Sequence, residues 1–295
     1  MHGWLVIDKP AGPGSTDVVA RVKRALREGG YPKMKVGHGG TLDPRASGVL
    51  PVALGEATKL AGRMLDADKV YEFTIRFGEE TDTLDAEGEV VATSGARPAP
   101  AQVEAVLPGF TGEIEQVPPA FSALKIGGKR AYDLARSGVG AEMKSRRVKV
   151  HSLTRPPGEC GDDEVTLVAR VSKGTYIRSL ARDIARALES VGHVTMLRRL
   201  KAGPFTLDSA ISLDKMGELA KARQLEQALL PLAAGLDDIP ALSVTPDQAR
   251  LLREGRKLAG IAAKPGLHLA TEGPVPVALV ELREGELRVV RGFNI

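Results

Sequence analysis

A glycine-rich segment at residues 37–51 holds the residues best suited to chemistry. It begins Gly37-His38-Gly39-Gly40-Thr41-Leu42-Asp43-Pro44 and ends Gly48-Val49-Leu50-Pro51. Glycine lets a backbone approach a ligand closely or adopt positive φ, and proline stiffens the loop. A lone carboxylate held in this way, that of Asp43, could serve as a nucleophile or as a base. On composition alone, a structural turn in which Asp43 only caps backbone amides is the favoured alternative.

A second candidate segment covers residues 172–180, where a predicted strand passes through a glycine turn into a helix. Arg178 falls in the first turn of that helix, where a cation is unfavourable beside the helix dipole. An arginine in this position is more easily explained by an anionic partner, either a carboxylate or a phosphate. The alternative is an ordinary solvated arginine, which the sequence alone leaves open.

The sequence lacks the residues that several classes of chemistry require. No Gly-Lys-Ser/Thr triplet or dinucleotide fingerprint accompanies the glycines, so no nucleotide cofactor is implied. The five histidines lack metal-ligand spacing, and the single Cys160 excludes an internal disulfide and a multi-cysteine metal site. No serine lies in a nucleophile elbow. We therefore expect no metal and no cofactor.

Charge is distributed unevenly, although the net charge is only +4. Residues 121–150 hold eight bases and two acids, and so do residues 170–201, whereas acids gather at residues 79–89. We expect a positive face that could bind a phosphate backbone. The alternative is a pair of ordinary solvated surfaces.

The hydrophobic pattern predicts strands and helices without a repeating alternation. Strands are expected at 3–7, 49–54, 70–77, 121–126, 148–153, 165–171 and 196–200, and helices at 15–27, 57–65, 176–188 and 225–234. Ser15 is the expected N-cap of the first helix, and residues 85–88 form the turn of a hairpin. This order favours an α+β fold, with a mixed, largely antiparallel sheet flanked by helices, over a doubly wound one.

A change in the sequence pattern after residue 235 suggests a second domain. We expect a large domain at residues 1–235 and a small β-rich domain at residues 236–295. No apolar stretch reaches the roughly 18 residues of a membrane span. The sequence therefore predicts a soluble, cytoplasmic protein.

Collinear motifs identify a resemblance that the single segments could not carry. The segment at 37–51, followed by Gly55-Glu56-Ala57-Thr58-Lys59, resembles the central motif of the bacterial tRNA pseudouridine-55 synthase family. Further matches are Asp8-Lys9-Pro10, Lys69-Val70-Tyr71-Glu72-Phe73, Thr81-Asp82-Thr83-Leu84-Asp85, Lys173-Gly174-Thr175-Tyr176-Ile177-Arg178 and Leu197-Arg198-Arg199-Leu200. Together they span residues 3–213. Gly39 and Arg45 occupy variable positions of the motif, and Arg45 is unusually polar there.

The resemblance implies a pseudouridine synthase fold and an isomerase that converts a uridine in the tRNA T-loop to pseudouridine without a cofactor. Asp43 matches the essential aspartate, which acts covalently or as a base. Arg178 matches its ion-pair partner, and Tyr71 the aromatic that stacks on the flipped base and assists proton transfer. His38 matches a residue beside the flipped nucleotide. The further positions expected to contact RNA are Lys9, Gly40, Thr41, Lys173, Tyr176, Leu197 and Arg198.

The resemblance also bears on partners and alternatives. It implies a PUA-like C-terminal domain that binds RNA, a tRNA substrate held through its T-loop and T-stem, and a monomer that needs no protein partner. One alternative is a tRNA-binding and folding factor that acts mainly by base flipping. Another is a synthase directed to ribosomal RNA by a guide RNA.

Overall fold

The computed structural model describes all residues except 123–124, 127–128, 131–142, 159–160 and 162. The chain divides into two compact units. The first comprises Met1–Pro44, Gly48–Leu65 and Ala202–Ile295, and the second comprises Arg45–Ser47 and Asp66–Lys201. No helix among the described residues is long and apolar enough to cross a bilayer.

The first unit is built on a small antiparallel sheet. Its strand order is β14-β1-β3, and β2 pairs with residues 52–54 of β3. The bounds are β1 Gly3–Lys9, β2 Val36–His38, β3 Ser47–Leu54 and β14 Leu229–Pro231. The helices and single turns are α1 Ser15–Glu28, η1 Gly55–Leu60, α2 Ala61–Asp66, η3 Leu207–Ser209, α6 Leu213–Lys221, η4 Leu225–Ala228 and η5 Leu232–Leu236. A short strand, β13 Phe205–Thr206, precedes η3.

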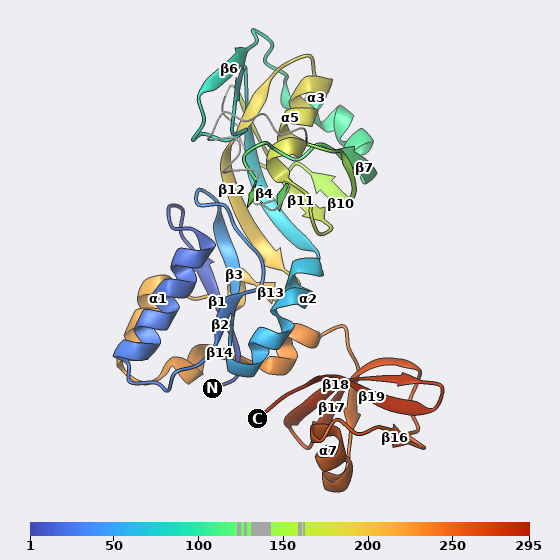
Figure 1. The fold of residues 1–295 in the computed structure, drawn as a ribbon. Helices are drawn as coiled ribbons and strands as arrows, with labels where there is room; N and C mark the ends of the chain where they lie inside the picture. Colours follow the sequence, from blue (N-terminus) through green and yellow to red (C-terminus); the bar gives the residue numbers. More distant parts are fainter. Residues whose placement is uncertain (123–124, 127–128, 131–142, 159–160, 162) are drawn as a thin grey trace. The chain divides into compact units, whose positions relative to one another are not determined.

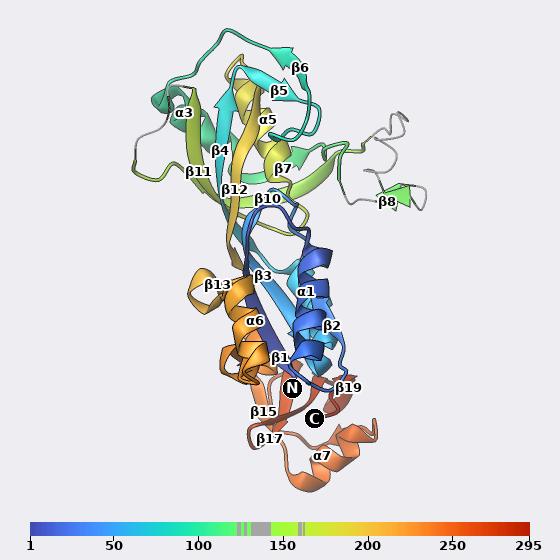
Figure 2. The ribbon, with the colours of Figure 1, turned by 90° about the vertical axis from the view of Figure 1, so that its left-hand side faces the viewer.

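The core of this sheet forms around Trp4. β1 is apolar along nearly its whole length because both of its faces are covered, and Trp4, Leu5, Val6 and Ile7 are fully buried. The indole N–H of Trp4 donates to the carbonyl of Leu232 at 3.1 Å. Helices α1 and α6 lie against each other beside the sheet (Figure 2). This packing fixes the end of β1, from which the chain enters the loop at residues 10–14.

The C-terminal residues form a five-stranded sheet with one helix, which confirms the expected β-rich domain. Its order is β15-β17-β18-β19-β16, and β15 runs parallel to β17. The bounds are β15 Ala241–Ser243, α7 Pro246–Arg253, β16 Leu258–Ala259, β17 Gly266–Glu272, β18 Val275–Arg283 and β19 Glu286–Gly292. Ala249 and Leu252 of α7 pack into the core of this sheet. The domain boundary after residue 235 stays a prediction.

The second unit is a longer antiparallel sheet covered by helices (Figure 1). Its order is β12-β4-β11-β10-β7, with bounds β4 Lys69–Phe77, β7 Gly112–Gln116, β10 Arg146–Thr154, β11 Glu164–Val171 and β12 Gly192–Ala202. The helices are α3 Pro100–Val106, the single turn η2 Leu107–Phe110, and α5 Ile177–Ala187. Two hairpins are formed by β5 Glu79–Thr81 with β6 Val90–Thr93, and by β8 Lys125–Ile126 with β9 Lys129–Arg130. Phe73, Ile75 and Phe77 of β4 alternate into one core with Ile184 of α5.

The α+β class and the largely antiparallel pairing are therefore confirmed, while two predicted helices are wrong in detail. The helix expected at 57–65 is the turn η1 followed by α2. The helix expected at 225–234 is interrupted by β14, which pairs with β1. Pro231 lies inside that range, and proline cannot supply the N–H that a helix interior requires. The strand expected at 121–126 is described only at Lys125–Ile126, and residues 123–124 lie outside the described part.

Candidate active site

Asp43 lies half-buried in the loop that joins β2 to β3. The loop begins where the amide of Gly39 donates to the carbonyl of Pro51 at 2.8 Å. A side chain at Gly39 would place its Cβ 2.8 Å from the Cβ of Met64, and Gly40 has a φ of +140°. At Gly39 there is no space for a side chain, and at Gly40 the positive φ disfavours one. The glycines set the path by which the chain reaches Asp43.

Ser15 anchors the residue before Asp43. Its hydroxyl accepts the amide N–H of Leu42 at 2.8 Å and donates to the carbonyl of Leu42 at 3.0 Å. The helix cap is instead Gly14, whose amide donates to the carboxylate of Asp17 at 2.9 Å. The prediction of Ser15 as the N-cap is therefore wrong, because its hydroxyl is directed into the loop rather than to the helix.

Lys9 anchors the residue after Asp43. Its side chain is fully buried, and its ammonium group donates to the carbonyls of Pro10, Pro13 and Pro44 at 3.0, 2.7 and 2.9 Å. The carbonyl of Pro44 also accepts the amide N–H of Gly12 at 2.8 Å. Asp43 is thus bracketed by two residues whose backbone groups are tied to the first turn of α1 and to the loop after β1. The structure places Lys9 inside the unit as a tether of this loop.

The other predicted residues of this loop lie close to Asp43 in sequence. His38 is half-buried on β2, opposite Val52 of β3. Gly40 is buried and Thr41 is exposed. The first unit therefore presents Asp43, His38 and Thr41 from one short segment fixed at both ends.

Tyr71 lies on β4 of the second unit, opposite Ala169 of β11. Its side chain is half-buried and packs against the core that contains Phe73. The residue therefore rests against the core while part of its surface stays accessible.

Arg178 is buried at the start of α5. Its guanidinium group donates to the carbonyls of Thr83 and Phe121 at 2.8 and 3.1 Å. It also lies 3.4 Å from a carboxylate oxygen of Asp85. Three acceptors from two loops therefore fix the orientation of this cation.

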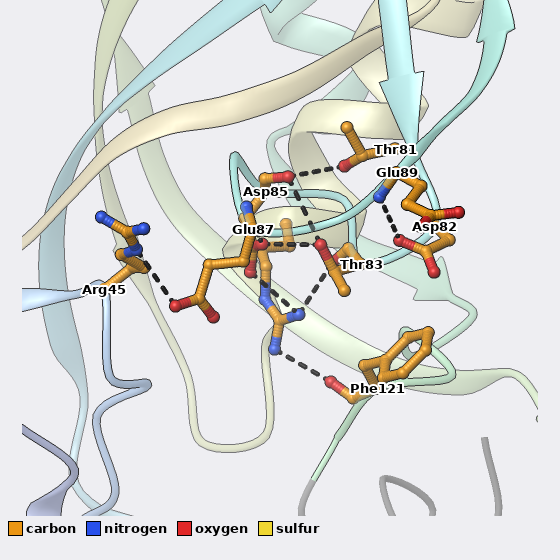
Figure 3. Close-up of polar contacts among 9 residues, drawn as sticks. Arg45, Thr81, Asp82, Thr83, Asp85, Glu87, Glu89 and Phe121 are labelled. Atoms are coloured by element: carbon orange, nitrogen blue, oxygen red, sulfur yellow. Dashed lines mark hydrogen bonds and ion pairs between the residues drawn. The ribbon is translucent and has the colours of Figure 1, made fainter. Parts of the chain in front are cut away.

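Asp85 is a residue of the site to which the sequence analysis gave no role. Its other carboxylate oxygen accepts the hydroxyl of Thr83 at 2.6 Å and the amide of Glu87 at 3.0 Å (Figure 3). Leu84 between them has a φ of +63°, which is rare for a branched side chain. The signal in the sequence was the run Thr81-Asp82-Thr83-Leu84-Asp85, which resembled the family without indicating what Asp85 contacts.

Tyr176 is the N-cap residue of α5, and its backbone is held by Gln116 of β7. The side-chain amide of Gln116 donates to the carbonyl of Tyr176 at 3.0 Å and accepts its N–H at 2.7 Å. The guanidinium of Arg146 stacks 4.8 Å above the centre of the Tyr176 ring. Its Nε and Nη2 groups are buried and have no hydrogen-bond partner among the described residues. Arg146, which was not among the predicted residues, therefore presents donors beside a predicted RNA contact.

Three further predicted residues flank these groups on the second unit. Lys173 is exposed, and its ammonium lies 2.9 Å from the carboxylate of Asp66. Leu197 packs partly against the core, and Arg198 donates to the hydroxyl of Ser47 at 3.3 Å. The predicted residues thus divide between the units, with Lys9, His38, Gly40, Thr41 and Asp43 on the first and Tyr71, Lys173, Tyr176, Arg178, Leu197 and Arg198 on the second.

The electrostatics of the second unit are dominated by buried cations. Burial, together with the nearby charge of Arg199, lowers the pKa of Lys69, at the start of β4, to about 8. Arg199 is itself 1% exposed. Two cations buried this closely favour anions in their surroundings. No group of three histidine, cysteine or acidic residues with the geometry of a metal site occurs in the described part of the chain.

The chain is similar to known proteins over its whole length. Residues 25–177 match the model of the TruB family pseudouridylate synthase N-terminal domain, and residues 178–237 match the tRNA pseudouridylate synthase B C-terminal domain. The tRNA pseudouridine synthase B of Novosphingobium aromaticivorans is 62% identical over 298 residues, which covers 100% of this chain and 98% of the relative. That of Zymomonas mobilis subsp. mobilis is 60% identical over 294 residues, which covers 100% and 96%.

A solved structure is similar over nearly the whole chain. It is an H/ACA RNP bound to a substrate RNA containing 2′-deoxyuridine, and the matched chain is 26% identical with a TM-score of 0.74. The match covers 99% of this chain and 85% of that chain. The expected fold is therefore confirmed at the level of the whole chain.

Proposed function

Because the chain belongs to the TruB family of pseudouridylate synthases, we propose that it converts the uridine at position 55, in the T-loop of tRNA, to pseudouridine. The observation that carries the proposal is full-length identity of 62% and 60% to two proteins named tRNA pseudouridine synthase B. The isomerisation breaks the bond from N1 of uracil to the sugar and forms one from C5 to the same sugar carbon. Reactant and product have the same composition, so no co-reactant is consumed.

In this proposal Asp43 is the catalytic carboxylate. It acts either by attacking the nucleotide or as a base, and both roles require the ionised form. The anchoring of Leu42 by Ser15 and of Pro44 by Lys9 supports the assignment, because a reacting group must be held within a fraction of an ångström. A structural turn would need no such anchoring on both sides.

Tyr71 and Arg178 complete the proposed catalytic group. A target base must leave its stack, at a cost of a few kcal/mol, and an aromatic ring such as that of Tyr71 offsets part of this cost. Arg178 supplies a fixed cation as the proposed partner of the ionised carboxylate, which it would orient. The buried and fully oriented guanidinium of Arg178 supports this role.

The remaining contacts of the proposal concern RNA. His38, Gly40 and Thr41 hold the flipped nucleotide, while Lys173, Tyr176, Leu197 and Arg198 contact the T-arm, and residues 236–295 form an RNA-binding domain. Lys9 acts on RNA only indirectly, since its ammonium is used inside the unit. The protein acts as a monomer and without a protein partner.

The test is a reaction with purified protein, an unmodified tRNA transcript, and neither metal nor added cofactor. Pseudouridine at position 55 is expected with the wild type and absent with Asp43→Asn, while both bind tRNA. Tight binding without product from the wild type would favour the RNA-folding alternative. The likeness to an H/ACA RNP raises the guide-directed alternative, which a product formed without any guide RNA would exclude.

A further inference from the structure

A large cavity in the first unit lies apart from the Asp43 loop. Its volume is about 720 Å³, which is within the range of ligand sites. It is bounded by the last turns of α1, by the segment 31–37 that includes β2, and by Thr58 and Ala61 of η1 and α2. All of these elements belong to one unit, and β2 leads directly into the Asp43 loop.

The rim of this cavity is strongly basic. Lys23 and Arg27 of α1 and Lys33 and Lys35 of the following loop line it, and all four side chains are exposed. Within the described part of the chain, none of the four forms an ion pair, and no acidic residue lines the cavity. Lys173 differs, because its ammonium pairs with Asp66. Four like charges in a lining that contains no acidic residue favour a polyanionic ligand.

The walls of the cavity are apolar and partly aromatic. Leu26, Met34 and Val36 contribute to them, and so does the ring of Tyr31. That ring is fixed, because its hydroxyl accepts the amide of Leu225 at 3.0 Å and donates to Glu226 at 3.2 Å. A bare phosphate would gain nothing from such walls, whereas a nucleobase stacks on aromatic and apolar surfaces.

We propose that this cavity binds a nucleotide of the RNA substrate outside the reacting one, with its base against the apolar wall and its neighbouring phosphates on Lys23, Arg27, Lys33 and Lys35. The inference rests on the proposed function for the identity of the RNA. The site would raise affinity for tRNA and hold the RNA while the uridine reacts at Asp43. It would therefore act on KM rather than on kcat.

The test compares charge reversals on one helix. Lys23→Glu with Arg27→Glu changes two rim residues, and Arg21→Glu with Arg24→Glu changes two exposed residues of α1 that do not line the cavity. The rim variant should raise Kd and KM for tRNA at least about tenfold and reduce the salt dependence of binding, because phosphate contacts are lost. Its kcat at saturating tRNA should stay within about twofold of the wild type.

A second pair, Lys33→Glu with Lys35→Glu, leaves α1 untouched and should act in the same way. This guards against a loss of helix stability as the cause, and thermal unfolding of each variant checks it. Equal Kd values for rim and control variants would overturn the proposal. The proposal would also be overturned if a rim variant lost binding of free adenosine monophosphate, measured by calorimetry, but kept its Kd for tRNA.

Separate measurements test the proposed function and the cavity proposal. Pseudouridine formation by the wild type, with Asp43→Asn as its control, tests the proposed function. The Kd comparison is made by fluorescence anisotropy on labelled tRNA and needs no turnover. An inactive wild type whose rim variants still lose tRNA affinity would leave the cavity proposal standing and remove the catalytic one.

Discussion

At the scale of single residues, the most informative contacts are those that hold Asp43 without touching its carboxylate. Ser15 satisfies both backbone groups of Leu42, and Lys9 gives its ammonium to three carbonyls, one of them that of Pro44. Both residues lie near the start of the chain and far in sequence from the segment that they position. The position of the Asp43 loop thus depends on contacts from β1 and α1.

Ser15→Ala should therefore damage catalysis more than binding. The substitution leaves the amide of Leu42 buried without its acceptor, which costs about 1–3 kcal/mol of stability, and it frees the loop on one side of Asp43. We expect kcat to fall at least about tenfold while Kd for tRNA changes little, as measured by single-turnover kinetics and anisotropy. Ser212→Ala is the matched control, because it removes a serine that accepts a backbone amide at the cap of α6. Equal kcat values for the two variants would contradict the prediction.

At the scale of elements, the turn at residues 82–88 acts as a support for the first turn of α5. Asp85 bonds within the turn through one oxygen and faces Arg178 with the other. The bridge between Asp85 and Val194 connects the turn to β12. The turn therefore connects the hairpin of β5 and β6, the helix α5 and the strand β12 around the guanidinium of Arg178.

Asp85→Asn tests this support. The side-chain carbonyl of asparagine can still accept the bonds from Thr83 and Glu87, but its amide cannot pair with Arg178. We expect a loss of about 1–3 kcal/mol in the free energy of unfolding together with a fall in kcat. Urea denaturation and steady-state kinetics measure the two effects. Asp82→Asn, in the same turn but bonded to the amide of Glu89, should leave kcat close to the wild-type value.

Sequence patterns predicted the helices and strands more accurately than they predicted the contacts between side chains. The hydrophobic periodicity predicted β4, α1 and α5 to within one residue at each end, because it reports burial directly. It could not show that Ser15 bonds to Leu42 or Gln116 to Tyr176, because these pairs are 27 and 60 positions apart. β14 was missed for the same reason, since its pairing with β1 is a tertiary contact. Arg136, one of the bases of residues 121–150, lies outside the described part of the chain.

At the scale of the whole first unit, the C-terminal strand is fastened to the segment that carries η1. The ammonium of Lys59 donates to the carbonyl of Gly292 at 2.8 Å, and the carboxylate of Glu56 accepts the amide of Asn294 at 2.8 Å. Phe293 between them is buried in the core around Trp4. The C-terminal domain is thus attached through its last residues as well as through the chain that leads into it.

Glu56→Gln should weaken this attachment in a pH-dependent way. Burial raises the pKa of Glu56, but the hydrogen bonds from Lys59 and Asn294 outweigh it and hold the pKa below its usual value of 4.5. A lowered folded-state pKa stabilises the protein above pH 4.5, and this stabilisation is lost as the pH falls through the lowered value. Because Glu56 is only partly buried and solvent still screens its charge, the effect at pH 7 should be below about 1 kcal/mol.

Amide hydrogen exchange at Asn294 is the sensitive measurement, because it reports the local opening of the strand end. The variant should exchange faster than the wild type at pH 7, and stability measured by urea denaturation should converge for the two proteins below about pH 4. Glu254→Gln is the control, since among the described residues Glu254 pairs only with the exposed Arg250 on α7. A constant difference between variant and wild type from pH 7 down to pH 3 would show that Glu56 acts through packing, because only the ionised carboxylate is lost on acidification.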